Sequence, residues 1–254
     1  MRYKGTHSGI YLLPNLLTTA SLFSAFYSIV ASLKAQYEVA VIAIFIGMIA
    51  DGLDGRIARM TNTQTAFGAE YDSLSDMVTF GVAPALLLYS WGLQQLGKVG
   101  WLIAFIYTAA VALRLARFNT QLETADKRYF QGLSSPPAAA IVASFIWLCH
   151  QNHWSHFFVI IIAASFAVGA AMLMVSNVRY NSFKKLDFKG KVPFLYLLLI
   201  VILFVAIASN PSLILFIASL AYALSGPFQT LIALQRVRKQ RRHVPKERAR
   251  NKVI

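Results

Sequence analysis

Long apolar stretches separated by short polar connections dominate the pattern of this sequence. Each stretch approaches the ~20 residues that a helix needs to cross the hydrocarbon core of a bilayer. Because backbone polar groups inside a bilayer must be bonded within their own segment, such stretches predict helices. We expect an all-α integral membrane protein, a polytopic bundle of about eight transmembrane helices over residues 12–33, 38–58, 73–96, 99–118, 135–152, 156–176, 192–209 and 212–234.

Composition agrees with a membrane protein and argues against an ordinary soluble domain. Hydrophobic residues make up 57% of the 254 positions and charged residues only 13%, with a mean hydropathy of +0.56. Soluble domains carry about 25% charged residues. Because no extended polar region separates the apolar stretches, we expect one transmembrane domain over residues 1–234, followed by a polybasic cytoplasmic tail over residues 235–254.

The net charge of +14 could indicate nucleic acid binding, but the positions of the basic residues give another explanation. Lysine and arginine accumulate on the cytoplasmic side of membrane proteins. With the N-terminus inside, 22 of them lie on the inner side and only Lys34 and Lys98 lie outside. We therefore expect both termini in the cytoplasm, in the inner membrane of a prokaryote, and no nucleic acid partner. The basic tail either attracts anionic membrane lipids or only marks topology.

Four aspartates between positions 51 and 76 form the most unusual polar cluster of the sequence. Asp51 and Asp54 are three residues apart near the end of the second stretch, and Asp72 and Asp76 are four apart at the start of the third. Each pair therefore shares one face of its helix. The short connection predicts antiparallel neighbours whose acidic faces oppose each other, unless the aspartates only cap helices and pair with nearby arginines.

Opposed carboxylates at a membrane edge repel one another unless cations neutralise them, and such residues are functional candidates. Oxygen ligands without histidine or cysteine favour Mg²⁺ or Mn²⁺ over zinc. Four carboxylates could hold two such ions, an arrangement suited to phosphoryl-type displacement. Gly52 and Gly55 weaken the helix between the acids, which indicates close approach of a ligand or of another helix.

The spacing of these residues resembles the signature of the CDP-alcohol phosphotransferases, D-x2-D-G-x2-A-R-x8-G-x3-D-x3-D, at every defined position. The resemblance implies a six-helix core and metal binding by Asp51, Asp54, Asp72 and Asp76. It also implies contacts to a CDP-linked lipid by Pro14, Asn15, Thr18, Gly55, Arg59 and Thr65.

Two downstream segments resemble the phosphatidylserine synthase branch of that family, and the likeness covers roughly residues 8–190. They are Arg114-Leu-Ala-Arg117-Phe-Asn119 with the following Phe130–Pro136 segment, and Ser176–Lys184. The branch usually has proline where this chain has Ser134. The resemblance implies CDP-diacylglycerol and L-serine as substrates, two helices beyond the core, and a homodimer.

An amino-acid acceptor carries a carboxylate, so its pocket should contain cationic and amide donors near the metals. The candidates for serine binding are Arg114, Arg117, Asn119, Arg179 and Lys184. Each of these basic residues could equally be a topology marker. In the expected reaction, Asp76 accepts the proton of the serine hydroxyl as general base. The alternatives are another acceptor, glycerol 3-phosphate or inositol phosphate, and a divalent-cation transporter.

Overall fold

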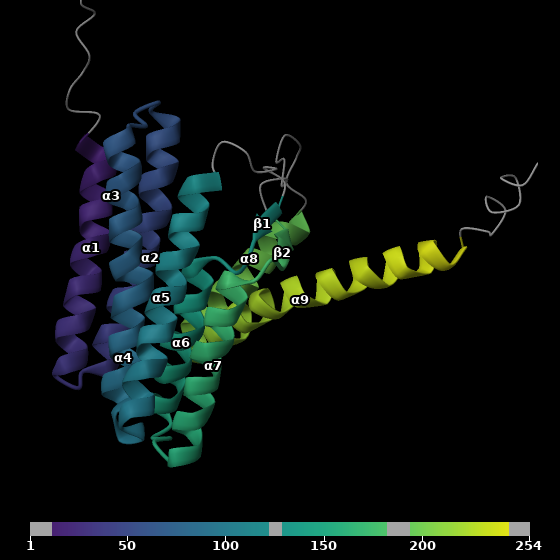
Figure 1. Ribbon diagram of the computed structural model, residues 1–254. Helices are drawn as coiled ribbons and strands as arrows, with labels where there is room; N and C mark the ends of the chain where they lie inside the picture. The colour runs from purple at the N-terminus through teal and green to yellow at the C-terminus, as the bar shows by residue number, and fades with distance from the viewer. Residues whose placement is uncertain (1–11, 122–128, 182–193, 244–254) are drawn as a thin grey trace, which may run out of the picture.

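Helices form nearly all of the structure, a computed structural model that describes residues 12–121, 129–181 and 194–243 (Figure 1). The α-helices are α1 (Leu12–Leu33), α2 (Tyr37–Met60), α3 (Ala66–Asp76), α4 (Ala83–Trp91), α5 (Lys98–Gln121), α6 (Ser135–Gln151), α7 (Phe157–Val175), α8 (Phe194–Ser209) and α9 (Pro211–His243). A π-helical segment, η1 (Met77–Val82), joins α3 to α4, and a 3₁₀ turn, η2 (Leu93–Leu96), precedes α5. The prediction of an all-α membrane protein is confirmed.

Five described helices are long and apolar enough to cross a membrane: Leu12–Leu33, Ala66–Trp91, Lys98–Thr120, Phe157–Val175 and Pro211–Thr230. The other three expected spans, which correspond to α2, α6 and α8, fall short for different reasons. Helices α6 and α8 have only 17 and 16 residues. Every 18-residue window of α2 contains at least three charged residues, among them the aspartates of the acidic cluster.

The third predicted stretch began too late along the chain. Its helix starts at Ala66 rather than at residue 73, and Thr65 caps it by accepting a hydrogen bond from the backbone N–H of Gly68 at 2.9 Å. The first turns are polar, so hydropathy alone did not include them. The helix then continues through the π-helical segment to Trp91. Tyr107 of α5 donates to the Phe80 carbonyl within that segment at 3.1 Å.

Small and hydroxylated side chains bring α1, α2 and the π-helical segment close together. Ser21 donates to the Gly47 carbonyl at 3.0 Å and lies 3.3 Å from the Thr79 hydroxyl. A β-carbon at Gly47 would lie 3.1 Å from the Thr79 methyl group. Such close backbone approach through small residues is typical of helices packed in membranes. It fixes the helices that carry the aspartates.

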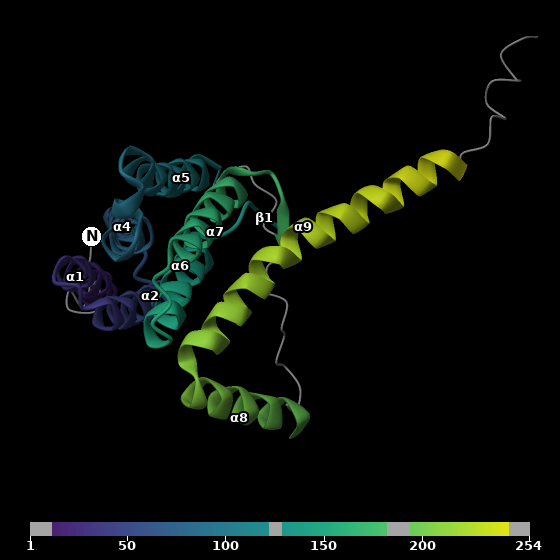
Figure 2. The same ribbon diagram turned by 90° about the horizontal axis from the view of Figure 1, so that it is seen from below.

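Helix α6 forms the centre of the bundle, and most of its side chains are buried. It contacts α2, α4, α7 and α9. In Figure 2, α1, α2 and α4 to α7 form one group, while α9 crosses beside α6 and α8 lies beyond it. Helix α9 is a single 33-residue helix that continues past residue 234 to His243, so the helix does not end where the basic tail was expected to begin.

A short antiparallel ribbon, β1 (Tyr129–Gln131) and β2 (Arg179–Asn181), was not expected from the sequence. Tyr180 fastens the ribbon to α9, because its hydroxyl donates to the Ala223 carbonyl at 2.9 Å and its ring lies against Gly226. Burial raises the pKa of Tyr180 to about 12, so the hydroxyl keeps the proton that it donates. The ribbon thereby connects the end of α7 to the start of α6.

Gly132 follows β1 in a left-handed conformation, with φ +79°. A β-carbon there would collide with the Met174 carbonyl oxygen and lie 2.8 Å from Nη2 of Arg117. We therefore expect Gly132→Ala to lower the free energy of unfolding by about 2 kcal/mol, since both strain and collision act. Thermal unfolding in detergent measures this, with Gly169→Ala as control because nothing lies within 4 Å of its added carbon. If Gly132→Ala and Gly169→Ala were equally stable, the strain and the collision expected at Gly132 would be contradicted.

Candidate metal and substrate site

Three of the four aspartates meet where the end of α2 faces α3. One carboxylate oxygen each of Asp51, Asp72 and Asp76 lies within 4.8 Å of the others. In Figure 1 the end of α2 and the start of α3 lie at the top, beside the start of α1, and the last turns of α3 lie below them. The predicted antiparallel arrangement is therefore present, and both helices turn acidic residues toward the same point.

Two carboxylate oxygens at this point have no hydrogen-bond partner among the described residues. Oδ1 of Asp72 and Oδ1 of Asp76 are buried and have no hydrogen-bond partner in the described structure. A buried charge without a partner is strongly unfavourable, so such groups are normally paired or bind metal. Since all the donors are carboxylate oxygens, the group fits a hard divalent cation, Mg²⁺ or Mn²⁺.

Asp54 has a different environment from the other three aspartates, although their spacing in the sequence does not distinguish it from them. Its side chain is 4% exposed, and its Oδ2 accepts a hydrogen bond from the Thr18 hydroxyl at 2.6 Å. Thr18 also donates to the Pro14 carbonyl at 3.1 Å. Asp54 therefore lies outside the group of three and connects α2 to α1. Its role as a metal ligand stays a prediction.

A polar cavity of about 320 Å³ opens beside Asp54 and Asp72. Its volume lies in the range of small-molecule sites, roughly 300–1,000 Å³. It is bounded by α1, the end of α2, the connection after it and the start of α3. All six residues expected to contact the CDP-linked lipid line this one cavity: Pro14, Asn15, Thr18, Gly55, Arg59 and Thr65.

The shape of the cavity depends on two glycines. A β-carbon at Gly68 would lie 3.1 Å from the Thr65 hydroxyl and 3.3 Å from Oδ1 of Asn15, so a larger side chain would crowd both. At Gly55 the nearest atom would be Nη1 of Arg59, at 3.7 Å. Gly55 thus leaves room beside the arginine. A β-carbon added at Gly52 would have no neighbouring atom within 4 Å, and Gly52 does not line the cavity.

Of the five residues expected to bind serine, the structure describes the side chains of Arg114, Arg117 and Asn119. Arg114 of α5 lies within electrostatic range of Asp76, and its Nη1 donates to the Ser135 hydroxyl at 2.8 Å. Asn119 donates to the Ser73 hydroxyl at 3.0 Å and so connects α5 to α3. The side chain of Arg179 and all of Lys184 lie outside the described residues.

Arg117 has a different environment from Arg114. Its Nη2 donates to the carbonyls of Gln131 at 2.9 Å and Met174 at 3.0 Å, and its Nη1 to that of Val175 at 3.1 Å. These bonds satisfy carbonyls at the end of α7, where a cation is favourable. Arg117 therefore fastens α5 to α7 and to the ribbon, and its use in binding serine stays a prediction.

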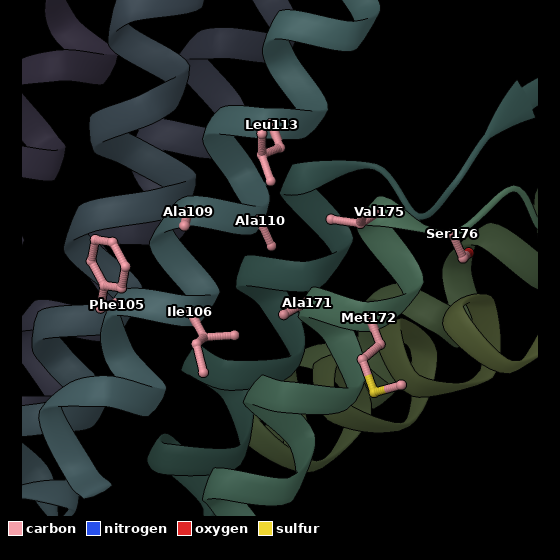
Figure 3. A pocket seen from close by; sticks show the side chains of 9 residues that line it. All are labelled: Phe105, Ile106, Ala109, Ala110, Leu113, Ala171, Met172, Val175 and Ser176. Carbon is pink, nitrogen blue, oxygen red and sulfur yellow. The ribbon is translucent and has the colours of Figure 1, made fainter. Parts of the chain in front are cut away.

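A second cavity, of about 490 Å³, is larger, but its described lining is almost entirely apolar. It is an open groove between α5 and the end of α7, and Figure 3 shows its lining: Phe105, Ile106, Ala109, Ala110, Leu113, Ala171, Met172, Val175 and Ser176. No titratable side chain lines it. An apolar wall of this kind suits a surface that faces lipid. The polar cavity beside Asp54 and Asp72 is therefore the better candidate for catalysis.

Sequence reasoning missed Ser135, Thr63 and Gln64. Ser135 contacts Arg114, while Thr63 and Gln64 lie in the connection between α2 and α3 and line the polar cavity. Ser135 lies inside the Phe130–Pro136 segment that resembles the phosphatidylserine synthase branch, so the resemblance could have identified it as a candidate site residue. Nothing in the residue types at 63 and 64 distinguishes them from ordinary loop residues.

Comparison with known proteins shows the family to which this chain is similar. Residues 11–164 match the CDP-alcohol phosphatidyltransferase family. The CDP-diacylglycerol–serine O-phosphatidyltransferase of Helicobacter pylori is 38% identical over 196 residues, which cover 77% of this chain and 83% of the relative. That of Bacillus subtilis is 34% identical over 175 residues, 68% of this chain and 92% of the relative.

An archaeal relative extends the comparison. The archaetidylserine synthase of Methanothermobacter thermautotrophicus is 33% identical over 170 residues, 66% of this chain and 69% of the relative. With the acidic group on α2 and α3 inside the matched region, the chain belongs to the CDP-alcohol phosphatidyltransferase family. It is a membrane enzyme of that family.

The metal site can be tested without turnover. We expect Asp72→Asn to weaken Mn²⁺ binding by more than about tenfold, because even outer-shell partners of metal ligands are worth about 10–100-fold. Paramagnetic titration of the detergent-solubilised protein measures the affinity. Glu70→Gln is the matched control, an exposed acid on the same helix outside the group. If both variants bind Mn²⁺ equally well, Asp72 is not a ligand.

Proposed function

We propose that this enzyme transfers the phosphatidyl group of CDP-diacylglycerol to the hydroxyl of L-serine, giving phosphatidylserine and CMP. The observation that carries the proposal is the group of three aspartates beside a polar cavity lined by the residues expected to contact the CDP-linked lipid. The names of the relatives support serine as the acceptor.

In this proposal the cavity between α1, α2 and α3 receives the CDP part of the lipid. Gly55 leaves space beside Arg59, whose guanidinium can donate to the diphosphate. Asp51, Asp72 and Asp76 would hold two Mg²⁺ or Mn²⁺ ions, with Asp54 as the fourth ligand. When bound, the ions neutralise charge on the diphosphate during displacement.

The chain's own residues then perform the proton transfer. Asp76 accepts the proton of the serine hydroxyl as that oxygen attacks the phosphorus nearer the lipid. The bond between this phosphorus and the oxygen that bridges it to CMP breaks, and CMP leaves with the bonding electrons. The proton on Asp76 passes to solvent before the next turnover. Arg114, across from Asp76, is the candidate for holding the serine carboxylate.

The distribution of charge supports an inner-leaflet site. Near the acidic end lie four described arginines, Arg56, Arg59, Arg114 and Arg117, while Lys34 and Lys98 lie at the opposite helix ends. By the positive-inside rule the acidic end faces the cytoplasm. The substrates would then reach the site from the cytoplasm and the inner leaflet of a prokaryotic inner membrane. A homodimer stays a prediction.

The acceptor is tested by measuring CMP release from CDP-diacylglycerol by the purified protein with Mn²⁺. We expect release with L-serine, and little with glycerol 3-phosphate or inositol phosphate, because the similar proteins are named as serine O-phosphatidyltransferases. A preference for either phosphate acceptor over serine would overturn the substrate assignment while leaving the reaction class intact.

The base is tested by Asp76→Asn. A general base contributes about 10²–10⁴-fold to the rate, so we expect kcat to fall by at least about 10²-fold. The variant should still insert into the membrane and unfold at the same temperature as the wild type. The measurement is kcat for CMP release at saturating serine and Mn²⁺. Near-normal turnover by the variant would exclude Asp76 as the base.

The CDP cavity is tested by filling it. We expect Gly55→Val to raise KM for CDP-diacylglycerol by at least about fivefold, the equivalent of the ~1 kcal/mol minimum cost of overpacking. The KM for serine should change little. Gly52→Val is the matched control, because it lies on the same helix but outside the cavity lining. Equal KM values for the two variants would place the CDP group elsewhere.

A further inference from the structure

Arg114 and Asp76 carry opposite charges within electrostatic range of each other, yet the structure does not join them. The hydrogen bond recorded for Arg114 goes from Nη1 to the Ser135 hydroxyl at 2.8 Å. Nε of Arg114 and Oδ1 of Asp76 are both buried and without a hydrogen-bond partner. Two complementary groups therefore each keep a hydrogen-bonding atom that no described residue satisfies.

Ser135 is the described hydrogen-bond partner of Arg114. Its side chain is 0% exposed, and the guanidinium of Arg114 is the partner of its hydroxyl. A hydrogen bond to a charged group is stronger than one between neutral groups. Removing this acceptor would leave the guanidinium to the groups that act on it electrostatically, of which Asp76 has the largest effect and Tyr222 a smaller one.

The position of Ser135 is itself fixed by the chain that leads to it. The backbone N–H of Gly132 donates to the Val178 carbonyl at 2.8 Å, and that of Leu133 to the Leu173 carbonyl at 3.0 Å. Leu133 is fully buried, and two prolines follow Ser135 in the first turn of α6. Proline in the first turn restricts the backbone, so the Ser135 hydroxyl cannot easily follow a moving arginine.

We propose that Ser135 is a positioning residue that orients Arg114 to receive the carboxylate of the acceptor and keeps its guanidinium from pairing with Asp76. This rests on the proposed function, because it assumes an acceptor with a carboxylate. The acceptor then lies between the two groups, its hydroxyl toward Asp76 and its carboxylate toward Arg114. Ser135 thus contributes to the binding of the acceptor through the orientation of Arg114.

The proposal predicts a change that is selective for one substrate. Ser135→Ala should raise KM for serine by about tenfold, the equivalent of 1.4 kcal/mol, and leave KM for CDP-diacylglycerol within about twofold. Ser134→Ala is the matched control, since Ser134 precedes the same helix and makes no side-chain capping bond. In Ser135→Ala the released guanidinium should also compete with Mn²⁺ at Asp76 and lower Mn²⁺ affinity, a readout that does not require turnover.

A double-mutant cycle decides whether Ser135 acts through Arg114. Lysine keeps the charge but lacks the forked donors, so Arg114→Lys alone should also raise KM for serine. Adding Ser135→Ala to Arg114→Lys should then change KM for serine by less than about twofold. Thermal unfolding of each variant shows that it is folded.

The experiments test the proposed function and the role of Ser135 separately. Wild-type turnover with serine tests the proposed function, whereas the ratios between variants test the role of Ser135. If the wild type uses serine and Ser135→Ala leaves both KM for serine and Mn²⁺ affinity unchanged, the positioning role is wrong and the proposed function stands. Full additivity of the two substitutions would likewise overturn it, because Ser135 would then act independently of Arg114.

Discussion

Repulsion among buried carboxylates between α2 and α3 is the constraint on which the site depends. Asp51, Asp72 and Asp76 bring their oxygens within 4.8 Å of one another, and two of those side chains have an oxygen without a partner. Charges buried in this way are tolerated only when they are compensated. The close packing of α1, α2 and the π-helical segment through Ser21, Gly47 and Thr79 holds the helices in place against this repulsion.

The π-helical segment directly after Asp76 is part of the same arrangement. π-Helical turns are less favourable than α-helix and occur frequently at functional sites. Here Tyr107, which is almost fully buried, donates to the Phe80 carbonyl within the segment. A hydrogen bond from α5 thus satisfies a backbone group inside the irregular turn. The acidic helix is thereby supported on the side of α5, the same helix that carries Arg114.

Local spacing made much of the site predictable. The intervals between Asp51 and Asp54 and between Asp72 and Asp76 place each pair on one helix face, and the short connection opposes the faces. Spacing could not distinguish Asp54 from Asp51, because the difference comes from Thr18 on another helix. The start of α3 was misplaced because its first turns are polar. The ribbon and Gly132 depend on contacts between distant segments, and no local pattern contains them.

The two arginines that begin and end Arg114–Arg117 show why one sequence motif can combine two roles. Both lie on α5 and both looked like candidates for the acceptor carboxylate. Arg117 has its donors occupied by carbonyls at the end of α7 and in β1, where the partial negative charge of a helix end compensates it. Arg114 keeps a buried nitrogen without a partner. A cation whose terminal nitrogens donate to backbone carbonyls stabilises the fold. A cation that keeps a buried nitrogen without a described partner, next to an acidic group, can still bind an anionic ligand.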